Sequence, residues 1–323
     1  MMEKIYKGDG EDLIPLFSSV IPDLDIDINK WRWKYLNNPL NESLIAVYEE
    51  DGKIVSEEAI VPLKFYYKGD ILKVGHSVDS MTLEEYRGKG IFKKLALLTL
   101  DEGKKRGYSF FYGFPNPNSK PIYLNKLNWK LIGNIRRWLF PLNLNFLSTR
   151  MKINLTFFDP IFKIGKGLIK YKGEYVKVND FSGIDKYLSY LYKNYEMFIL
   201  RDEDFLNWRY LKHPYYKYDI FKDSKNLFVL RIKKLDIKRG SIEEFLIKDE
   251  SSFSDIINFS IKYFFDNDID LVDIWIKEGD PLEKILIKKG FIPYNKKPII
   301  IYPFDDIDLS RKYFINFSDL DII

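Results

Sequence analysis

The period of the hydrophobic and polar positions changes between residues 74 and 105. Residues 74–83 alternate, with Val74, His76 and Val78 on one side of an expected strand. Residues 91–105 place apolar side chains at helical spacing and predict an amphipathic helix. Two glycines and two basic residues lie between these segments. The pattern therefore predicts a strand, a glycine-rich loop and a helix in succession.

This loop has the properties of an anion-binding site. Gly88 and Gly90 allow the backbone to turn inward, so that its N–H groups and the positive end of the following helix converge on one point. Arg87 and Lys89 add positive charge, and a diphosphate is the expected ligand. The two commoner phosphate loops do not fit, because neither Gly-Lys-Ser/Thr nor G-x-G-x-x-G is present.

A second motif follows the next expected strand, residues 108–114. It runs from Asn116 through Ser119 to Tyr123 and ends near Asn128 and Trp129. Ser119 before a proline predicts the N-cap of a short helix. Asn at position 128 is compatible with the left-handed backbone that often ends a helix.

The chain contains an internal repeat. The segment 33–39, Trp-Lys-Tyr-Leu-Asn-Asn-Pro, recurs at 208–214 as Trp-Arg-Tyr-Leu-Lys-His-Pro. A strand, a polar turn and a helix are expected before each copy, and a hairpin after each; the first hairpin has Asp51 and Gly52 at its turn. We therefore predict an α/β fold with mixed sheet in two tandem domains, residues 1–145 and 175–323, joined by the segment 146–174.

The second repeat lacks the glycine loop. Its strand-to-helix turn, residues 248–255, contains no Arg-Gly-x-Gly, and Ser252 or Ser254 is the expected N-cap. The acidic residues of this turn would repel a diphosphate. We expect this repeat to be degenerate, and either to stabilise the first domain or to shape its acceptor pocket.

Composition narrows the function classes. The 323 residues include no cysteine and two histidines, so we expect neither a disulfide nor a metal site. The net charge is +4 without a dense basic stripe, so nucleic acid is not an expected partner. The sequence shows neither a signal-peptide core nor an apolar run long enough to span a membrane, and a cytoplasmic protein is expected.

The two motifs together resemble those of the GNAT superfamily of acyl-CoA-dependent N-acetyltransferases. Residues 87–92 match R-x-x-G-x-G/A except at the last position, where Phe92 is bulky. Residues 116–129 are similar to N-x-x-A-x-x-L-Y-x-x-L-G-F, with one extra residue after Tyr123 and Asn128 in place of glycine.

The resemblance implies acetyl-CoA as co-substrate and a primary amine as acceptor. In this family a backbone N–H of the strand before the loop holds the thioester carbonyl. The implied cofactor-binding residues are the strand end, the loop and the second motif, namely Met81, Thr82, Leu83, Arg87, Gly88, Lys89, Gly90, Ile91, Phe92, Asn116 and Ser119. Asn116 is expected to bond the pantetheine amides.

The resemblance also implies catalytic candidates. Tyr123 is the candidate acid for the departing thiolate. His76 and Asp79 are candidate bases, and their spacing of three predicts that they lie on opposite faces of the strand. A third option for the base is a water molecule that passes the proton to a carboxylate such as Glu57 or Glu58. Trp33 could line an acceptor site, but its recurrence at position 208 favours core packing.

Two other functions fit the duplication. One is an aminoacyl-tRNA-dependent transferase of tandem-GNAT type, whose donor has no diphosphate for the glycine loop to bind. The other is a non-catalytic acyl-CoA-binding protein. The identity of the acceptor and the oligomeric state stay open.

Overall fold

The computed structural model describes residues 2–22, 26–143, 148, 169–233, 237–308 and 312–320. The first half consists of β1 (Met2–Ile5), α1 (Ile14–Val20), α2 (Ile28–Tyr35), β2 (Leu44–Glu50), β3 (Lys53–Tyr67), β4 (Asp70–Thr82), η1 (Glu84–Tyr86), α3 (Ile91–Lys105), β5 (Phe110–Gly113), α4 (Lys120–Lys126) and β6 (Lys130–Pro141). The expected strand, loop and helix are therefore β4, residues 83–90 and α3.

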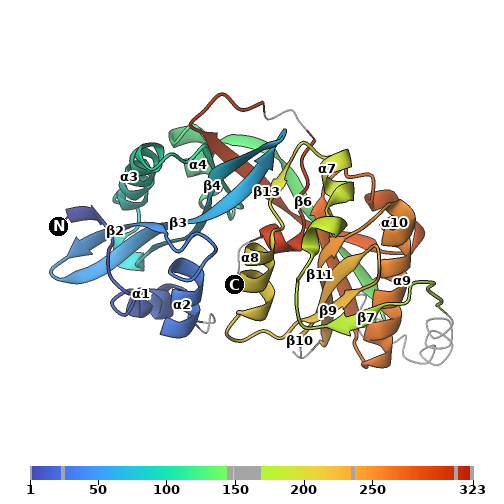
Figure 1. Cartoon of the computed structure of the whole chain (residues 1–323). Helices are drawn as coiled ribbons and strands as arrows, with labels where there is room; N and C mark the ends of the chain where they lie inside the picture. The colour runs from blue at the N-terminus through green and yellow to red at the C-terminus, as the bar shows by residue number, and fades with distance from the viewer. Residues whose placement is uncertain are drawn as a thin grey trace.

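The second half repeats this order with shorter helices before its hairpin. It consists of β7 (Val176–Val178), η3 (Ile184–Tyr187), α7 (Ser189–Asn194), β8 (Met197–Ile199), α8 (Glu203–Leu206), the π-helical turn η4 (Asn207–Leu211), β9 (Asp219–Lys222), β10 (Leu227–Lys233), β11 (Arg239–Leu246), α9 (Glu250–Asp266), β12 (Leu271–Lys277), α10 (Glu283–Lys288), β13 (Ile292–Pro303) and η5 (Phe317–Asp319). Figure 1 shows the two halves side by side, with β6 and β13 where they meet.

The described strands form one mixed sheet in the order β1-β2-β3-β4-β5-β13-β6-β12-β11-β10-β9-β7, with β8 paired to β3. The last strand of each half is exchanged: β13 pairs with β5, and β6 pairs with β12. These two strands also pair with each other, antiparallel, at the centre of the sheet. The α/β fold with a mixed sheet is confirmed, and each half completes the sheet of the other.

Trp33 and Trp208, the repeated tryptophans, meet between the halves. Their rings stack with centroids 5.1 Å apart, and both are buried. The indole N–H of each donates to the backbone carbonyl of the other, at 2.9 Å in both cases. This reciprocal pair is what an internal two-fold axis requires, and it places Trp33 in the core rather than in an acceptor site.

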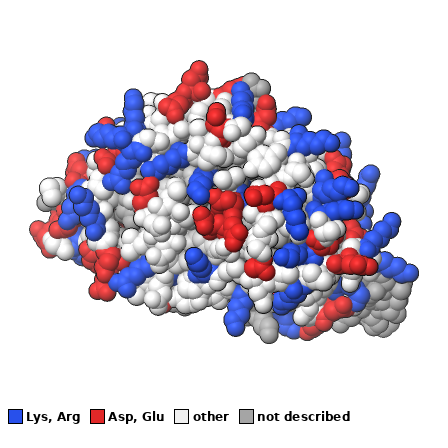
Figure 2. All heavy atoms as spheres, in the orientation of Figure 1, with Lys and Arg blue, Asp and Glu red and all other residues white. Residues whose placement is uncertain are grey.

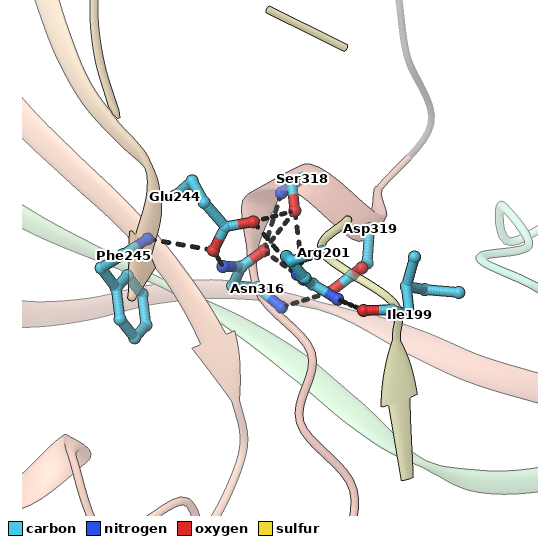
Figure 3. A network of polar contacts seen from close by, with 7 residues as sticks. All are labelled: Ile199, Arg201, Glu244, Phe245, Asn316, Ser318 and Asp319. Carbon is cyan, nitrogen blue, oxygen red and sulfur yellow. Dashed lines mark hydrogen bonds and ion pairs between the residues drawn. The ribbon is translucent and has the colours of Figure 1, made fainter. Parts of the chain in front are cut away.

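A buried arginine fixes the C-terminal segment to the second half (Figure 3). Arg201 donates to Asp319 at 2.6 Å and to Glu244 at 3.1 Å, and its side chain is fully buried. Asn316 and Ser318 supply further polar contacts to the same guanidinium. Because removing one partner would leave a buried charge without compensation, this network holds residues 316–319 tightly against β11.

The visible face carries charges of both signs. Figure 2 shows lysine and arginine interspersed with aspartate and glutamate over both halves, without a continuous basic stripe on this face. Within the described residues, no helix is long and apolar enough to cross a membrane.

Candidate active site

The glycine loop has the backbone conformation that its sequence predicts. Gly88 and Gly90 adopt left-handed φ angles of 75° and 76°, and α3 begins at the next residue, Ile91. A β-carbon built on either glycine would have no described atom within 4 Å. The loop therefore presents bare backbone next to the N-terminus of a 15-residue helix.

A groove of about 670 Å³ runs along this loop. Nine of the eleven predicted cofactor residues border it: Met81, Thr82, Arg87, Gly88, Gly90, Ile91, Phe92, Asn116 and Ser119. The other two predicted residues, Leu83 and Lys89, do not line the groove. The Leu83 amide donates to the carbonyl of Val55 at 2.9 Å, and the Lys89 ammonium lies 4.6 Å from the centre of the Tyr86 ring. The sequence missed Lys93 and Lys126, which also border the groove and add positive charge.

The groove opens where β4 and β5 separate. The parallel pairing of these strands ends at Ser77 and Gly113, whereas β4 continues to Thr82. Backbone amides alternate between the two edges of a strand, and the Leu83 amide faces β3. The amide of Thr82 therefore faces the edge that β5 has left, which is where a thioester carbonyl could be held.

Asp79 lies at an irregularity in β4. Its φ angle is 49°, and the register with β3 shifts by one residue at this point. The extra residue is a β-bulge, which interrupts the alternation of side chains along the strand. As a result, His76 and Asp79 border the same pocket, although their spacing predicts opposite faces.

This pocket, of about 200 Å³, continues the groove. The two cavities share Ile21, Ser80, Met81, Asn116 and Ser119 as lining residues, and the pocket extends to Tyr123 and Phe114. Ile300 of β13 also borders it, so the second half contributes a residue to the site. The arrangement is a long groove with the glycine loop at one end and a smaller pocket with hydroxyl groups at the other.

Tyr123 lies at the inner end of the pocket with 3% of its surface exposed. Its hydroxyl donates to Glu58 at 3.1 Å and lies 3.0 Å from the hydroxyls of Ser77 and Ser80. Burial, followed by the nearby Glu58 charge, raises the pKa of Tyr123 well above its ordinary value. The phenol therefore stays protonated at neutral pH, as a proton donor must.

Glu58, one of the two carboxylates considered for a water relay, is buried. Burial raises the pKa of Glu58 to about 7, and hydrogen bonds from Ser80, Ser77 and Tyr123 partly offset this rise. The adjacent Glu57 is also buried, and burial raises its pKa well above the usual range. The sequence marks both residues as unusual, because they form an acidic pair within the largely apolar run of residues 54–63. A buried strand rarely contains acidic side chains.

The two candidate bases have other contacts. The Asp79 carboxylate accepts from the Lys34 ammonium at 2.5 Å and also from the Tyr35 hydroxyl, and Lys34 is itself buried. His76 is buried and stacks on Tyr112 with ring centroids 4.5 Å apart. Their roles as bases stay predictions, and the ion pair to Lys34 ties Asp79 to the shape of the bulge.

Ser119 is the N-cap residue of α4 and a proline stands in the first helical turn, as the sequence predicts. Ser119 makes no side-chain capping bond, because its backbone is already helical. The Asn116 side chain accepts from the amides of Asn118 and Ser119 instead, at 2.9 Å each. Its side-chain oxygen therefore orders the turn before α4, and the expected bond to pantetheine stays a prediction.

The second half has a different helix start at the equivalent position. Asp249, rather than Ser252 or Ser254, is the N-cap of α9, and its side chain accepts from the Ser252 amide at 2.8 Å. The predicted caps were wrong because the helix begins at Glu250, before either serine. A carboxylate thus occupies the helix end at which the first half has its glycine loop.

Comparison with known proteins agrees with this geometry. Residues 3–132 match the family model of the acetyltransferase (GNAT) domain. This part of the chain is similar to the GNAT acetyltransferase domain. The match includes β2 to β5, the glycine loop and Tyr123, and all the lining residues of the groove and the pocket except Ile300 lie within it. Among curated proteins, no sequence matches the chain.

Solved structures share the fold over most of the chain. A GCN5-related N-acetyltransferase from Anabaena variabilis has a TM-score of 0.67 at 14% identity, covering 94% of this chain and 73% of its own. One from Kribbella flavida has a TM-score of 0.62 at 11% identity, covering 94% and 71%. Saccharomyces cerevisiae N-myristoyltransferase with bound myristoyl-CoA has a TM-score of 0.63 at 11% identity, covering 93% and 82%.

Among the described residues, no group of three or more histidine, aspartate or glutamate side chains is arranged to hold a metal ion.

Proposed function

We propose that this GNAT domain transfers an acetyl group from acetyl-CoA to a primary amine. The observation that carries the proposal is the continuous cavity from the glycine loop to Tyr123. The diphosphate would bind the backbone of residues 88–90 at the start of α3, with Lys93 and Lys126 nearby. The pantetheine arm would then follow the edge of β4 toward Tyr123.

The reacting groups would meet where the two cavities join. The Thr82 amide would hold the thioester carbonyl and stabilise the oxyanion that forms when the amine attacks, an effect of several kcal/mol in comparable sites. The carbon–nitrogen bond forms, the carbon–sulfur bond breaks, and Tyr123 would protonate the departing sulfur. The amine would enter through the pocket bordered by His76, Phe114 and Ile300.

A screen of amine classes tests this function. The purified chain is incubated with acetyl-CoA and, in turn, glucosamine, spermidine and a lysine-containing peptide, while free thiol is followed over time. We expect amine-dependent thiol release for at least one class and a matching acetylated product by mass spectrometry. Tight CoA binding with no release for any amine would instead favour a non-catalytic acyl-CoA-binding protein.

The aminoacyl-tRNA alternative predicts a different dependence. Such an enzyme would not need the glycine loop, so its activity would survive Gly90→Val. Thiol release that is lost in this variant while the fold is retained would support a CoA donor. We propose further that the second half, residues 175–323, binds no CoA, because Asp249 closes the start of α9.

A further inference from the structure

We propose that Glu58 is a buried proton store for the transfer reaction, connected to the pocket by two separate hydroxyl groups. The inference rests on the proposed function and adds to it the path of the proton. Its basis is geometric: Glu58 lies behind the pocket wall, and the side chains between it and the pocket are those of Ser77 and Tyr123.

The contacts define two routes. The Ser77 hydroxyl donates to Glu58 Oε1 at 2.9 Å, and the Tyr123 hydroxyl donates to the same oxygen at 3.1 Å. Both Ser77 and Tyr123 border the pocket, whereas Glu58 is 1% exposed. Ser80, which also borders the pocket, holds the Tyr123 hydroxyl from a third side at 3.0 Å. A proton can therefore reach Glu58 by one hydroxyl and leave it by the other.

The other acidic side chains near Glu58 have different surroundings. The Asp79 carboxylate is paired with Lys34 and Tyr35 of α2, whereas the Glu58 carboxylate contacts Ser77 and Tyr123. Glu57 points to the other side of β3, because adjacent residues of a strand alternate, and burial raises its pKa well above the usual range. The pKa of Glu58, about 7, allows it to accept and return a proton near neutral pH.

The proton balance closes with this group in place. The acceptor begins as an ammonium, and one of its protons passes through Ser77 to the Glu58 carboxylate, which leaves a neutral amine. The amine attacks the thioester carbonyl; as the carbon–sulfur bond breaks, Tyr123 gives its proton to sulfur and regains one from Glu58. The second ammonium proton leaves the new amide nitrogen for solvent. Per turnover, one proton reaches CoA thiol and one is released.

Glu58→Gln tests the store. Glutamine keeps the size and can still accept hydrogen bonds from Ser77 and Tyr123, but it cannot hold the transferred proton. With an alkyl-amine acceptor whose own pKa lies near 10, the wild-type kcat should rise with pH through a limb near 7. In Glu58→Gln this limb should be absent and kcat at pH 8 should fall roughly 10²-fold or more, while the CoA Kd stays close to wild type.

Glu57→Gln is the matched control, because Glu57 borders neither the groove nor the pocket and contacts neither of the hydroxyl groups that reach Glu58. It makes the same substitution one residue away, at a carboxyl group that is buried but has no hydrogen-bond partner among the described residues. We expect it to keep both the limb near pH 7 and most of the wild-type kcat. If Glu58→Gln turns over with an unchanged pH profile, the proton store is wrong although the transferase function stands.

A measurement without turnover separates the inference from the function. The infrared carboxyl band that is lost in Glu58→Gln should titrate near pH 7 in the wild type. In Tyr123→Phe its midpoint should move upward, because the hydrogen bond from Tyr123 lowers the pKa of Glu58. A band that does not titrate between pH 5 and about 9 overturns the store. If the wild type releases no thiol with any amine, the proposed transferase function is wrong, and Glu58 has no transfer reaction in which to act as a proton store.

Discussion

Gly90→Val is the most direct test of the cofactor site. Gly90 is the N-cap of α3 with a φ of 76°, and a β-carbon at this position would project into space bordered by the groove rather than into other described atoms. The valine side chain would therefore stand where the phosphates are expected. It would also strain a left-handed backbone that β-branched residues rarely adopt.

The two consequences have different magnitudes. The strain costs about 1–2 kcal/mol of stability, which a folded domain of this size tolerates. The ligand would lose close approach to the loop; if two charge-assisted hydrogen bonds are lost, at about 1.5–3 kcal/mol each, the CoA Kd rises roughly 10²–10⁴-fold. The effect on binding should therefore exceed the effect on folding.

Gly52→Val is the control that separates them. Gly52 also has a φ of 76° and no described atom within 4 Å of a built β-carbon, but it lies in the hairpin turn between β2 and β3. Both variants should lose similar stability in thermal unfolding, and calorimetric titration should find weakened CoA binding only in Gly90→Val. Equal CoA affinity in two folded variants would refute the assignment of the loop.

Three further outcomes are expected. Tyr123→Phe keeps the ring packing on Phe92 and Trp129 but removes the hydroxyl, so kcat should fall roughly 10²–10⁴-fold with little change in CoA affinity; near wild-type turnover would make Tyr123 a packing residue. Titration calorimetry should give one CoA per chain, and two would contradict the degenerate second half. Burial lowers the pKa of His213 to about 3. Between about pH 6.5 and 3 the unfolded chain therefore binds a proton at this histidine and the folded chain does not. The free energy of unfolding should fall by a few kcal/mol as the pH drops through this window. His213→Gln should flatten that decline in urea unfolding.

Local sequence signals predicted the local structure of the site. The expected helix, residues 91–105, matches α3, and Asp51-Gly52 forms the two-residue turn of the hairpin. Asn128 adopts the left-handed backbone that its place after α4 predicted, with a φ of 58°. In each case the determining interaction lies within a few residues of the signal, so composition and spacing were sufficient.

Long-range features were beyond the same reasoning. The bulge at Asp79 depends on Lys34 and Tyr35, which lie more than 40 residues earlier in the chain. The network around Glu58 joins β3, β4 and α4, and its acidic residue gives no motif, only an apparent mismatch with a buried strand. The helix cap at Asp249 was missed for a local reason. Asp249, Ser252 and Ser254 could each cap a helix, and the backbone geometry decides which of them does.

The exchanged strands explain why a duplicated chain should keep a single site. Because the two halves repeat one pattern, the sequence cannot distinguish pairing of β5 with β6 from pairing of β5 with β13. The structure has the second arrangement, and it places Ile300 of the second half against the pocket of the first. A second half that supplies a strand and a pocket residue is needed even after its own glycine loop is lost. Under the proposed function, selection on the second half can then act through the shape of the acceptor pocket, while the diphosphate would bind the glycine loop of the first half with Lys93 and Lys126 nearby.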